Sequence, residues 1–262
     1  MIDLHTHVLP GIDDGPASVE GSLELARAAA AAGTTTIVAT PHIAWDLPNT
    51  AQTVADGVAA LQPVLDDAGI PIRLRTGGEV VITRAIDLDD AELTALRLGA
   101  GEWLLAECPL STAVSGFENL LHQLQARGHR VVLAHPERAP ALQRDPEILR
   151  RLVDAGMLSS ITAGSLRGDF GSTVRRFTLD LLEHDLVHNV ASDAHDARRR
   201  RPGIADAFAA AEEELPGLGE RQEWMTVDVP RAVLDGGPVP PPPGKPPRRR
   251  KRGLFRRASR SR

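Results

Sequence analysis

Five of the nine histidines stand where short apolar runs of the sequence end. His5 and His7 form an H-x-H pair in the opening segment MIDLHTH. Alternate residues of an extended strand point to the same side, so both imidazoles can reach one metal ion. Two polar residues at a strand end have the same pattern, and the pair alone does not decide between these interpretations.

The ends of the later apolar runs carry further imidazoles and carboxylates. They are His42, Glu79, Glu107, His135, Asp193 and His195. Such ligands, with no cysteine among them, suit Zn²⁺, Mn²⁺ or Fe²⁺. This number of ligands predicts more than one ion, and a carboxylate such as Glu79 can bridge two of them. Because water shared by two ions ionises near neutral pH, the set predicts a hydrolase that attacks a phosphorus or carbonyl centre.

The remaining histidines and the single cysteine are not expected to take part in this chemistry. His122, His129, His184 and His188 lie away from strand ends, where surface or capping roles are favoured. Cys108 follows Glu107 and is interpreted as a small apolar residue. A C-x5-R phosphatase loop is absent, since Val114 stands where its arginine would be.

Seven apolar runs predict the strands that position these residues. They are MIDLH, TTTIVAT, PIRLRTG, EWLLAEC, HRVVLAH, MLSSITA and LVHNVASD. Longer segments between them have helical character, and one opens at Ser18 as an N-cap and closes at Gly33. Strands that alternate with helices predict a parallel sheet, and this length favours a (β/α) barrel over an open sheet. The carboxyl ends of barrel strands share one mouth, where the candidate ligands would meet.

The composition excludes several classes of protein. The 262 residues are 42% hydrophobic, which is enough for a core and excludes a largely disordered chain. No apolar run is long enough to span a membrane, and the acidic, histidine-containing start does not resemble a signal peptide. One cysteine excludes a disulfide framework. We therefore expect a cytoplasmic protein.

The last 27 residues form a separate, basic tail. Residues 236–262 contain ten Lys and Arg and no acid, so residues 1–235 carry a balance of −15. Prolines and like charges predict disorder from about Asp235, which divides the chain into a domain at 1–235 and a tail at 236–262. The acidic body would repel nucleic acid, and none is expected as a partner. Leu254 and Phe255 among arginines favour a peripheral contact with the anionic inner face of a membrane, or docking on an acidic partner such as a kinase. The alternative, given equal weight, is that the tail is an extension without a binding role.

Six motifs, in this order, carry a family resemblance: DLHTH, DDGP, ATPH, GGE, AHPER and ASDAH. They resemble the polymerase and histidinol phosphatase (PHP) superfamily. Within it, Met1 to about Leu234 is similar to the bacterial tyrosine-protein phosphatases of capsule and exopolysaccharide loci. DDGP followed later by AHPER is the most specific part of the match. The resemblance implies a distorted seven-stranded (β/α) barrel of PHP type with three metal ions, most often manganese.

The resemblance also implies a role for each candidate ligand. The first ion would be held by His5, His7, Glu79 and Asp193; the second by Glu79, Glu107 and His135; the third by Asp14, His42 and His195. Composition alone would make Asp13 and Asp14 turn residues before Gly15. The resemblance moves Asp14 to the ligand set, whereas Asp13 keeps the turn interpretation.

Two arginines are expected to bind phosphate. Arg138 follows His135 by three residues, and a guanidinium can bind phosphate oxygens bidentately. Its alternative is a salt bridge to Glu137 or to a helix carboxylate. The family carries an arginine followed by proline after the last D-x-H, which selects Arg201. The segment DARRRRP is one residue longer than that pattern, so Arg200 stays an alternative, and Arg198 and Arg199 are interpreted as solvated.

Together these features predict a metal-dependent phosphatase that acts on phosphotyrosine. Its partner would be a bacterial tyrosine kinase of a polysaccharide export system. The same cluster could instead hydrolyse histidinol phosphate or nucleic acid, but DDGP and the length of the body disfavour both. The other alternative is a non-catalytic, metal-binding regulatory protein with a decayed site. The presence of all nine expected ligands disfavours that interpretation.

Overall fold

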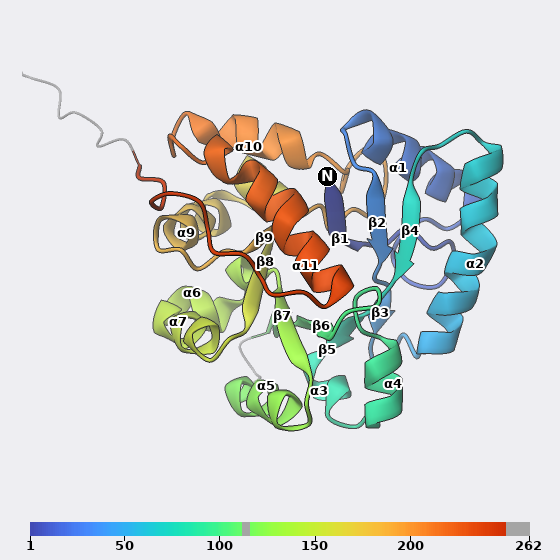
Figure 1. The fold of residues 1–262 in the computed structure, drawn as a ribbon, viewed down its shortest axis with the longest axis horizontal. Helices are drawn as coiled ribbons and strands as arrows, with labels where there is room; N and C mark the ends of the chain where they lie inside the picture. The colour runs from blue at the N-terminus through green and yellow to red at the C-terminus, as the bar shows by residue number, and fades with distance from the viewer. Residues whose placement is uncertain (112–115, 250–262) are drawn as a thin grey trace, which may run out of the picture.

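The structure is a computed structural model that describes residues 1–111 and 116–249. Strands and helices alternate along the chain, and the helices lie around the outside of the strands (Figure 1). The strands are β1 (Ile2–Thr6), β2 (Thr36–Ala39), β3 (His42–Ile43), β4 (Arg73–Thr76), β5 (Glu79–Val81), β6 (Trp103–Glu107), β7 (Arg130–Ala134), β8 (Leu158–Thr162) and β9 (Asn189–Ala191). The α-helices are α1 (Val19–Ala31), α2 (Ala51–Asp67), α3 (Ile82–Ala85), α4 (Asp90–Ala95), α5 (Phe117–Ala126), α6 (Pro140–Arg144), α7 (Pro146–Asp154), α8 (Ala163–Arg167), α9 (Ser172–Glu183), α10 (Ile204–Glu212) and α11 (Val229–Asp235). Three short turns of other helix types are η1 (Pro136–Arg138), η2 (Gly219–Arg221) and η3 (Trp224–Asp228).

The strands pair in parallel, but they form two sheets instead of the expected closed barrel. One sheet has the order β1-β2-β4 and the other the order β3-β5-β6-β7-β8-β9. Each of the seven predicted runs contains a strand, and β3 and β5 are additional short ones. Among the described residues, β1 and β9 form no regular ladder, and the parallel bridge of Thr6 with Ala194 lies where the two strands meet. The prediction of a parallel α/β fold is confirmed, whereas the distorted seven-stranded barrel is not confirmed, because the described strands number nine and form no closed sheet.

The break between the two sheets has a local cause. The pair β2–β4 is continued by the pair β3–β5, and Pro41 and the Gly77–Gly78 dipeptide lie at the joints. Proline lacks the backbone N–H that a ladder needs. A Cβ at Gly77 would lie 2.9 Å from methyl groups of Leu98 and Val38, so a larger residue would require these side chains to move. The strands therefore change direction here.

The first helix forms as its sequence predicts. Ser18 is the N-cap of α1, and its side chain accepts a hydrogen bond from the Gly21 N–H. The helix buries Leu25 and Ala29 against the core and ends before Gly33, whose φ of +87° favours glycine. The N-cap, the apolar face and the glycine stop all indicate the same helix, and the boundaries of α1 could therefore be predicted from the sequence.

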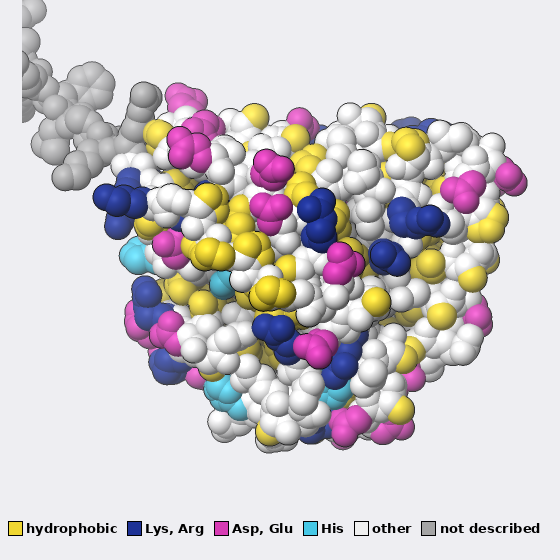
Figure 2. Space-filling view, in the orientation of Figure 1, with side chains coloured by type: hydrophobic (Ala, Val, Ile, Leu, Met, Phe, Trp, Pro, Cys, Tyr) yellow, Lys and Arg dark blue, Asp and Glu magenta, His cyan; other side chains and the backbone are white. Residues whose placement is uncertain are grey.

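The amino ends of the strands are covered by the last helical segment. The Asn189 side-chain amide at the start of β9 donates to the Met225 carbonyl of η3 at 2.8 Å. The Ala100 N–H, shortly before β6, donates to the Leu234 carbonyl of α11 at 3.1 Å. In Figure 1, α11 crosses the near face, and acidic and basic side chains are interspersed on that face in Figure 2. The opposite, carboxyl ends of the strands are where the predicted site residues lie.

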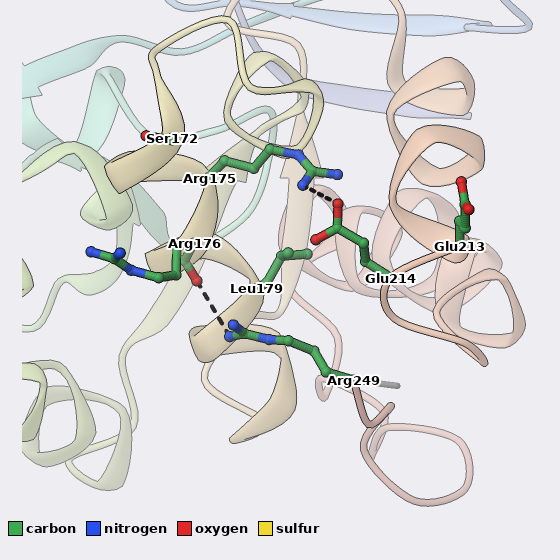
Figure 3. Close-up of a pocket in the computed structure, with 7 residues that line it drawn as sticks. All are labelled: Ser172, Arg175, Arg176, Leu179, Glu213, Glu214 and Arg249. Atoms are coloured by element: carbon green, nitrogen blue, oxygen red, sulfur yellow. Dashed lines mark hydrogen bonds and ion pairs between the residues drawn. The ribbon is translucent and has the colours of Figure 1, made fainter. Parts of the chain in front are cut away.

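The described part of the tail lies against the body. Residues 236–249 contain no helix or strand, but the Trp224 indole N–H donates to the Pro240 carbonyl at 2.9 Å. Arg249 pairs with Glu183 of α9 at 2.8 Å and lies beside the Arg176 carbonyl (Figure 3). Pro240 and Arg249 thus have partners on the body, and disorder from about Asp235 stays a prediction. Residues 250–262, with Leu254 and Phe255, lie outside the described residues, and the membrane contact stays a prediction.

Within residues 1–111 and 116–249, none of the helices has both the length and the apolar character that crossing a membrane requires.

Candidate metal centre

The predicted ligands converge at the carboxyl ends of the strands. Their ligand atoms form four overlapping groups, each within 4.8 Å: His7, Asp14, His42 and His195; His5, His7 and Asp193; His5, Glu79 and His135; His42, Glu79 and Glu107. Every one of the nine predicted residues belongs to at least one group. His5, His7, His42 and Glu79 each belong to two, so the groups form one continuous cluster.

Backbone hydrogen bonds bring the two ends of the strand series together at this cluster. The His7 N–H donates to the Ala194 carbonyl, and the Asp193 N–H donates to the His5 carbonyl, both at 2.9 Å. The Asp3 side chain strengthens this junction, since it accepts from the Ser192 N–H at 2.9 Å. The H-x-H pair therefore lies beside the D-x-H segment, although almost the whole chain separates them.

Glu79 occupies the centre of the cluster. Its side chain is 0% exposed, and its Oε1 lies 2.7 Å from His135 Nε2. Its Oε2 lies 3.2 Å from His5 Nε2, 3.3 Å from His7 Nε2 and 3.0 Å from His42 Nδ1. Burial by itself would raise the pKa of this carboxyl, but the surrounding imidazoles hold the pKa well below its usual range. Glu79 is therefore ionised and faces ligands on several sides, as a bridging carboxylate must.

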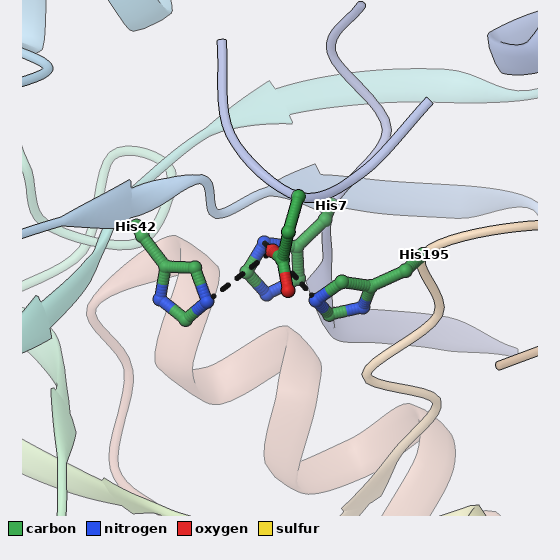
Figure 4. A group of neighbouring side chains, drawn as sticks. His7, His42 and His195 are labelled. Carbon is green, nitrogen blue, oxygen red and sulfur yellow. Dashed lines mark ion pairs between the residues drawn. The ribbon is translucent and has the colours of Figure 1, made fainter. Parts of the chain in front are cut away.

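Asp14 completes the outer side of the cluster. Its Oδ1 lies 3.1 Å from His195 Nε2 and 3.4 Å from His42 Nε2. Hydrogen bonds with these two imidazoles hold the pKa of Asp14 well below its usual range. The rings of His7 and His195 are 3.8 Å apart between centroids, and the imidazoles of His7, His42 and His195 point toward one another in Figure 4. Half of the Asp14 side chain is exposed, so this side of the cluster is open to solvent.

Two site residues hold a strained backbone. His135 has a φ of +33° and Asp193 a φ of +51°, a region that residues with a side chain seldom adopt. The His135 N–H is held by the Ser160 carbonyl at 2.8 Å, and both side chains are buried. Strain that the surrounding structure maintains at such positions is typical of functional sites.

The donor set fits divalent metal ions. Glu79 Oε2 and Asp193 Oδ1 are buried atoms without a hydrogen bond among the described residues, although imidazole nitrogens lie only 3.0–3.5 Å away. His5 Nε2 and His7 Nε2 face each other at 3.3 Å. Carboxylate oxygens and imidazole nitrogens that lie this close together in a buried site would cost free energy unless a cation lay between them. Imidazole and carboxylate oxygens are ligands that Mn²⁺, Fe²⁺ and Zn²⁺ accept.

Asp13 has a role that the sequence did not suggest. Its Oδ2 lies 2.7 Å from His7 Nδ1 and accepts the His42 N–H at 3.1 Å, while its Oδ1 accepts the Gly15 N–H at 2.9 Å. The turn interpretation is thus true, but the same carboxylate also orients His7. A carboxylate on the far nitrogen of a ligating imidazole is the usual support of a metal site. The two adjacent aspartates of DDGP are the sequence signal from which this supporting role could have been predicted.

Of the two arginines selected from sequence, the structure brings Arg138 to the cluster but not Arg201. Arg138 Nη1 donates to Asp193 Oδ2 at 2.8 Å, and its guanidinium lies 4.4 Å from the centre of the Phe170 ring. It does not pair with Glu137, whose buried carboxylate accepts from the Thr162 N–H and the Ser165 hydroxyl.

Arg201 instead points to Asp206 at 2.8 Å, with 40% of its side chain exposed. The alternative, Arg200, reaches the cluster: its Nη2 donates to Asp193 Oδ2 at 2.7 Å, and its Nη1 lies 3.6 Å from Asp14 Oδ2. The reason lies in the loop after His195. The Asp196 carboxylate accepts the N–H groups of residues 198–200, and the His195 N–H donates to the Arg200 carbonyl at 2.9 Å. This tight turn accommodates the extra residue of the segment and places the Arg200 side chain at the cluster.

Cys108 lies within the core, as predicted for a small apolar residue. Its side chain is buried, and burial beside Glu107 raises the pKa of the thiol well above its usual range. A thiol held protonated is a poor nucleophile. The remaining histidines, His122, His129, His184 and His188, take part in none of the four groups.

We therefore expect Cys108→Ala to keep its activity, with turnover within about threefold of the parent because only a buried apolar contact is lost. The variant should lose stability on the order of 1 kcal/mol, since a small buried group is removed. Phosphate release and thermal unfolding measure the two effects, and removal of metal by a chelator should abolish turnover in both proteins. A folded, metal-loaded Cys108→Ala protein without activity would contradict the assignment.

Comparison with known proteins agrees with this geometry. Residues 1–233 match the family model described as capsular polysaccharide synthesis, CpsB/CapC. The chain is 37% identical over 216 residues to the tyrosine-protein phosphatase YwqE of Bacillus subtilis, covering 82% of this chain and 85% of YwqE. It is 34% identical to CapC of Staphylococcus aureus, named as a putative tyrosine-protein phosphatase, over 76% of this chain and 79% of CapC.

Solved structures give the same result. A crystal structure from a study of YwqE and of CpsB from Streptococcus pneumoniae, described as metal-dependent tyrosine phosphatases, superposes with a TM-score of 0.83. The two sequences are 33% identical, and the match covers 96% of this chain and 100% of the other. A dihydropyrimidinase from Brevibacillus agri, with a TM-score of 0.52 and 13% identity, shares the fold alone. By sequence and by structure, the chain belongs to the CpsB/CapC family of capsular polysaccharide synthesis.

Proposed function

We propose that this protein is a metal-dependent protein-tyrosine phosphatase that hydrolyses phosphotyrosine in proteins and acts in capsule or exopolysaccharide synthesis. The observation that carries the proposal is the single cluster of nine imidazoles and carboxylates around Glu79, with two guanidiniums at its edge. Relatives that match most of the chain are named as tyrosine-protein phosphatases, which supports the same activity.

The proposed cofactor is manganese, with three ions, and Zn²⁺ or Fe²⁺ as alternatives. His5, His7, Glu79 and Asp193 would hold the first ion, Glu79, Glu107 and His135 the second, and Asp14, His42 and His195 the third. Two of the four groups share Glu79, which supports a bridging role for this residue. When bound, such ions supply Lewis-acid stabilisation of phosphate oxygens and an activated water.

The protein's own residues would then bind and orient the phosphate. Arg138 and Arg200 both donate to Asp193 Oδ2, from 2.8 and 2.7 Å, and their positions are therefore fixed before substrate arrives. Guanidiniums that are preorganised in this way stabilise the charge that develops in phosphoryl transfer. Asp13 would keep the His7 ring in its productive orientation.

An apolar hollow beside the cluster suits the tyrosyl ring of the substrate. A cavity of about 430 Å³ is lined by Glu107 together with Val81, Ile82, Pro109 and Leu110. Leu110 at its edge is 43% exposed, so an apolar side chain is available there to contact a bound ring. A ring in this hollow would hold its phosphate toward Glu107 and the cluster. The hollow thus supports phosphotyrosine over the shorter, aliphatic phosphoserine.

The proposed protein substrate is a bacterial tyrosine kinase of a polysaccharide export system. The family's role in capsular polysaccharide synthesis supports this choice.

The proposed function is tested by phosphate release from a phosphotyrosine peptide, the matched phosphoserine peptide and histidinol phosphate, each with manganese and after chelation. We expect manganese-dependent hydrolysis of the phosphotyrosine peptide to be the fastest. Equal or greater turnover of histidinol phosphate would overturn the proposal in favour of a histidinol phosphatase. Metal binding without any turnover would indicate a regulatory protein.

A further inference from the structure

A second, basic cavity lies next to Asp193 and shares no lining residue with the apolar hollow. Its volume is about 140 Å³. Four arginines line it, Arg167, Arg199, Arg200 and Arg201, against two aspartates, Asp169 and Asp193. Both aspartates are already paired: Asp169 with Arg167 at 2.7 Å, and Asp193 with Arg138 and Arg200. The lining therefore has more positive than negative charge.

Two of these guanidiniums are held unusually close together. Arg167 comes from α8, is only 12% exposed, and donates from Nη1 to the Gly203 carbonyl at 3.0 Å. A Cβ built on Gly203 would lie 3.2 Å from Arg167 Nη1 and 2.9 Å from Arg201 Nη1, so both guanidiniums approach the same point. The repulsion between like charges in this position would be relieved by an anion. Arg201 has Asp206 as a partner, but that pair is exposed and such pairs contribute little.

Arg199 supplies a cation whose guanidinium has no hydrogen-bond or salt-bridge partner in the part of the chain that the structure describes, although its charge helps to lower the pKa of Asp196. Its backbone N–H donates to Asp196. Its neighbour Arg198 is exposed as well, and its backbone N–H also donates to Asp196 Oδ1 at 2.6 Å. Arg198 does not line the cavity, whereas Arg199 does. The two residues form a natural matched pair.

The cavity shares a wall with the phosphate-binding groups. Phe170 lines it, and the same ring lies under the Arg138 guanidinium at 4.4 Å. Arg200 lines it too and donates to Asp193. An occupant of this cavity would therefore lie directly beside a phosphotyrosine bound at the cluster.

We propose that this cavity binds an anionic side chain of the substrate, a carboxylate or a second phosphate, which flanks the phosphotyrosine in the peptide chain. The inference rests on the proposed phosphotyrosine activity and adds a rule of sequence specificity to it. Clustered guanidiniums bind carboxylates and phosphates by the same charge-assisted hydrogen bonds, so either anion is accommodated.

The test compares phosphotyrosine peptides that carry Glu, Gln or a second phosphotyrosine at the flanking positions, with free phosphotyrosine as a substrate without flanks. For the parent enzyme we expect kcat/KM to be higher for the Glu peptide than for its uncharged Gln match by about three- to tenfold, the range of one or two partly exposed charge pairs. The difference should lie mainly in KM, because the flank is remote from the reacting phosphorus.

Arg199→Ala should remove most of this preference and Arg199→Glu should reverse it, whereas Arg198→Ala should keep it. All three variants should hydrolyse free phosphotyrosine at the parent rate, because neither arginine contacts the cluster. Comparison of the Glu and second-phosphotyrosine peptides distinguishes the two sources of the anion.

Equal rates on the Glu and Gln peptides, or the same loss in the Arg198 and Arg199 variants, would overturn the inference. Failure to hydrolyse any phosphotyrosine compound, free phosphotyrosine included, would instead refute the proposed function on which the inference rests.

Discussion

Replacement of Glu79 by glutamine should lower turnover by more than about 10³-fold, since loss of a single oriented charge-stabilising group already costs 10²–10³. Glu79 is fully buried, and four imidazole nitrogens lie 2.7–3.3 Å from its two carboxylate oxygens. Glutamine preserves the size of the side chain, but it removes the charge and one of the two acceptor oxygens. Because this residue belongs to two of the four groups, its loss should affect more than one ion.

Elemental analysis of the purified variants measures this directly, with His42→Ala for comparison. His42 also belongs to two groups, but its side chain is 20% exposed and its Nε2 faces Asp14, whereas Glu79 is fully buried between four imidazoles. We therefore expect the loss of His42 to remove mainly the ion on the outer side. We expect Glu79→Gln to retain less metal than His42→Ala, with far-ultraviolet circular dichroism confirming that both variants are folded. Equal metal content in two folded variants would contradict the bridging role of Glu79.

Arg200→Ala should reduce kcat on a small aryl phosphate by about 10²–10³, the usual effect of removing one preorganised donor at a transition-state anion. Arg201→Ala should stay within about threefold of the parent, because its guanidinium is engaged with Asp206 in an exposed pair. A small substrate has no flanking group, so the basic cavity plays no part in this measurement. Arg138→Ala should resemble Arg200→Ala, since both guanidiniums donate to the same oxygen of Asp193.

These neighbouring arginines are a sharp test, because the family pattern and the structure select different residues. A large loss in Arg201→Ala together with near-normal Arg200→Ala would show that the arginine before the proline binds phosphate after all. Kinetic analysis of both variants at saturating substrate separates a loss in kcat from a weaker KM.

Seven of the nine described strands and the residue types of the cluster could be predicted from the sequence, whereas the short strands β3 and β5, which begin at His42 and Glu79, could not. Apolar runs, helix caps and glycine stops are local signals, and they placed His5, His7, His42, Glu79 and His135 at strand ends without any knowledge of the fold. Parallel strands bring their carboxyl ends together whatever the details of closure. The site could thus be predicted even though the strands do not form a closed seven-stranded barrel.

Three features of the site depend on contacts between segments that are distant in the sequence, and they became visible only in the tertiary structure. The sheet divides where Pro41 lies beside the Gly77–Gly78 backbone. The Asp13 carboxylate contacts the His7 ring. The turn at Asp196 places Arg200, and not Arg201, at the cluster. The basic cavity likewise joins Arg167 of α8 to the loop after β9. The type of a residue indicates which chemistry it can perform, and its position in a periodic pattern indicates which face of a helix or strand it occupies. The direction of a loop side chain is set by hydrogen bonds that exist only once the chain has folded.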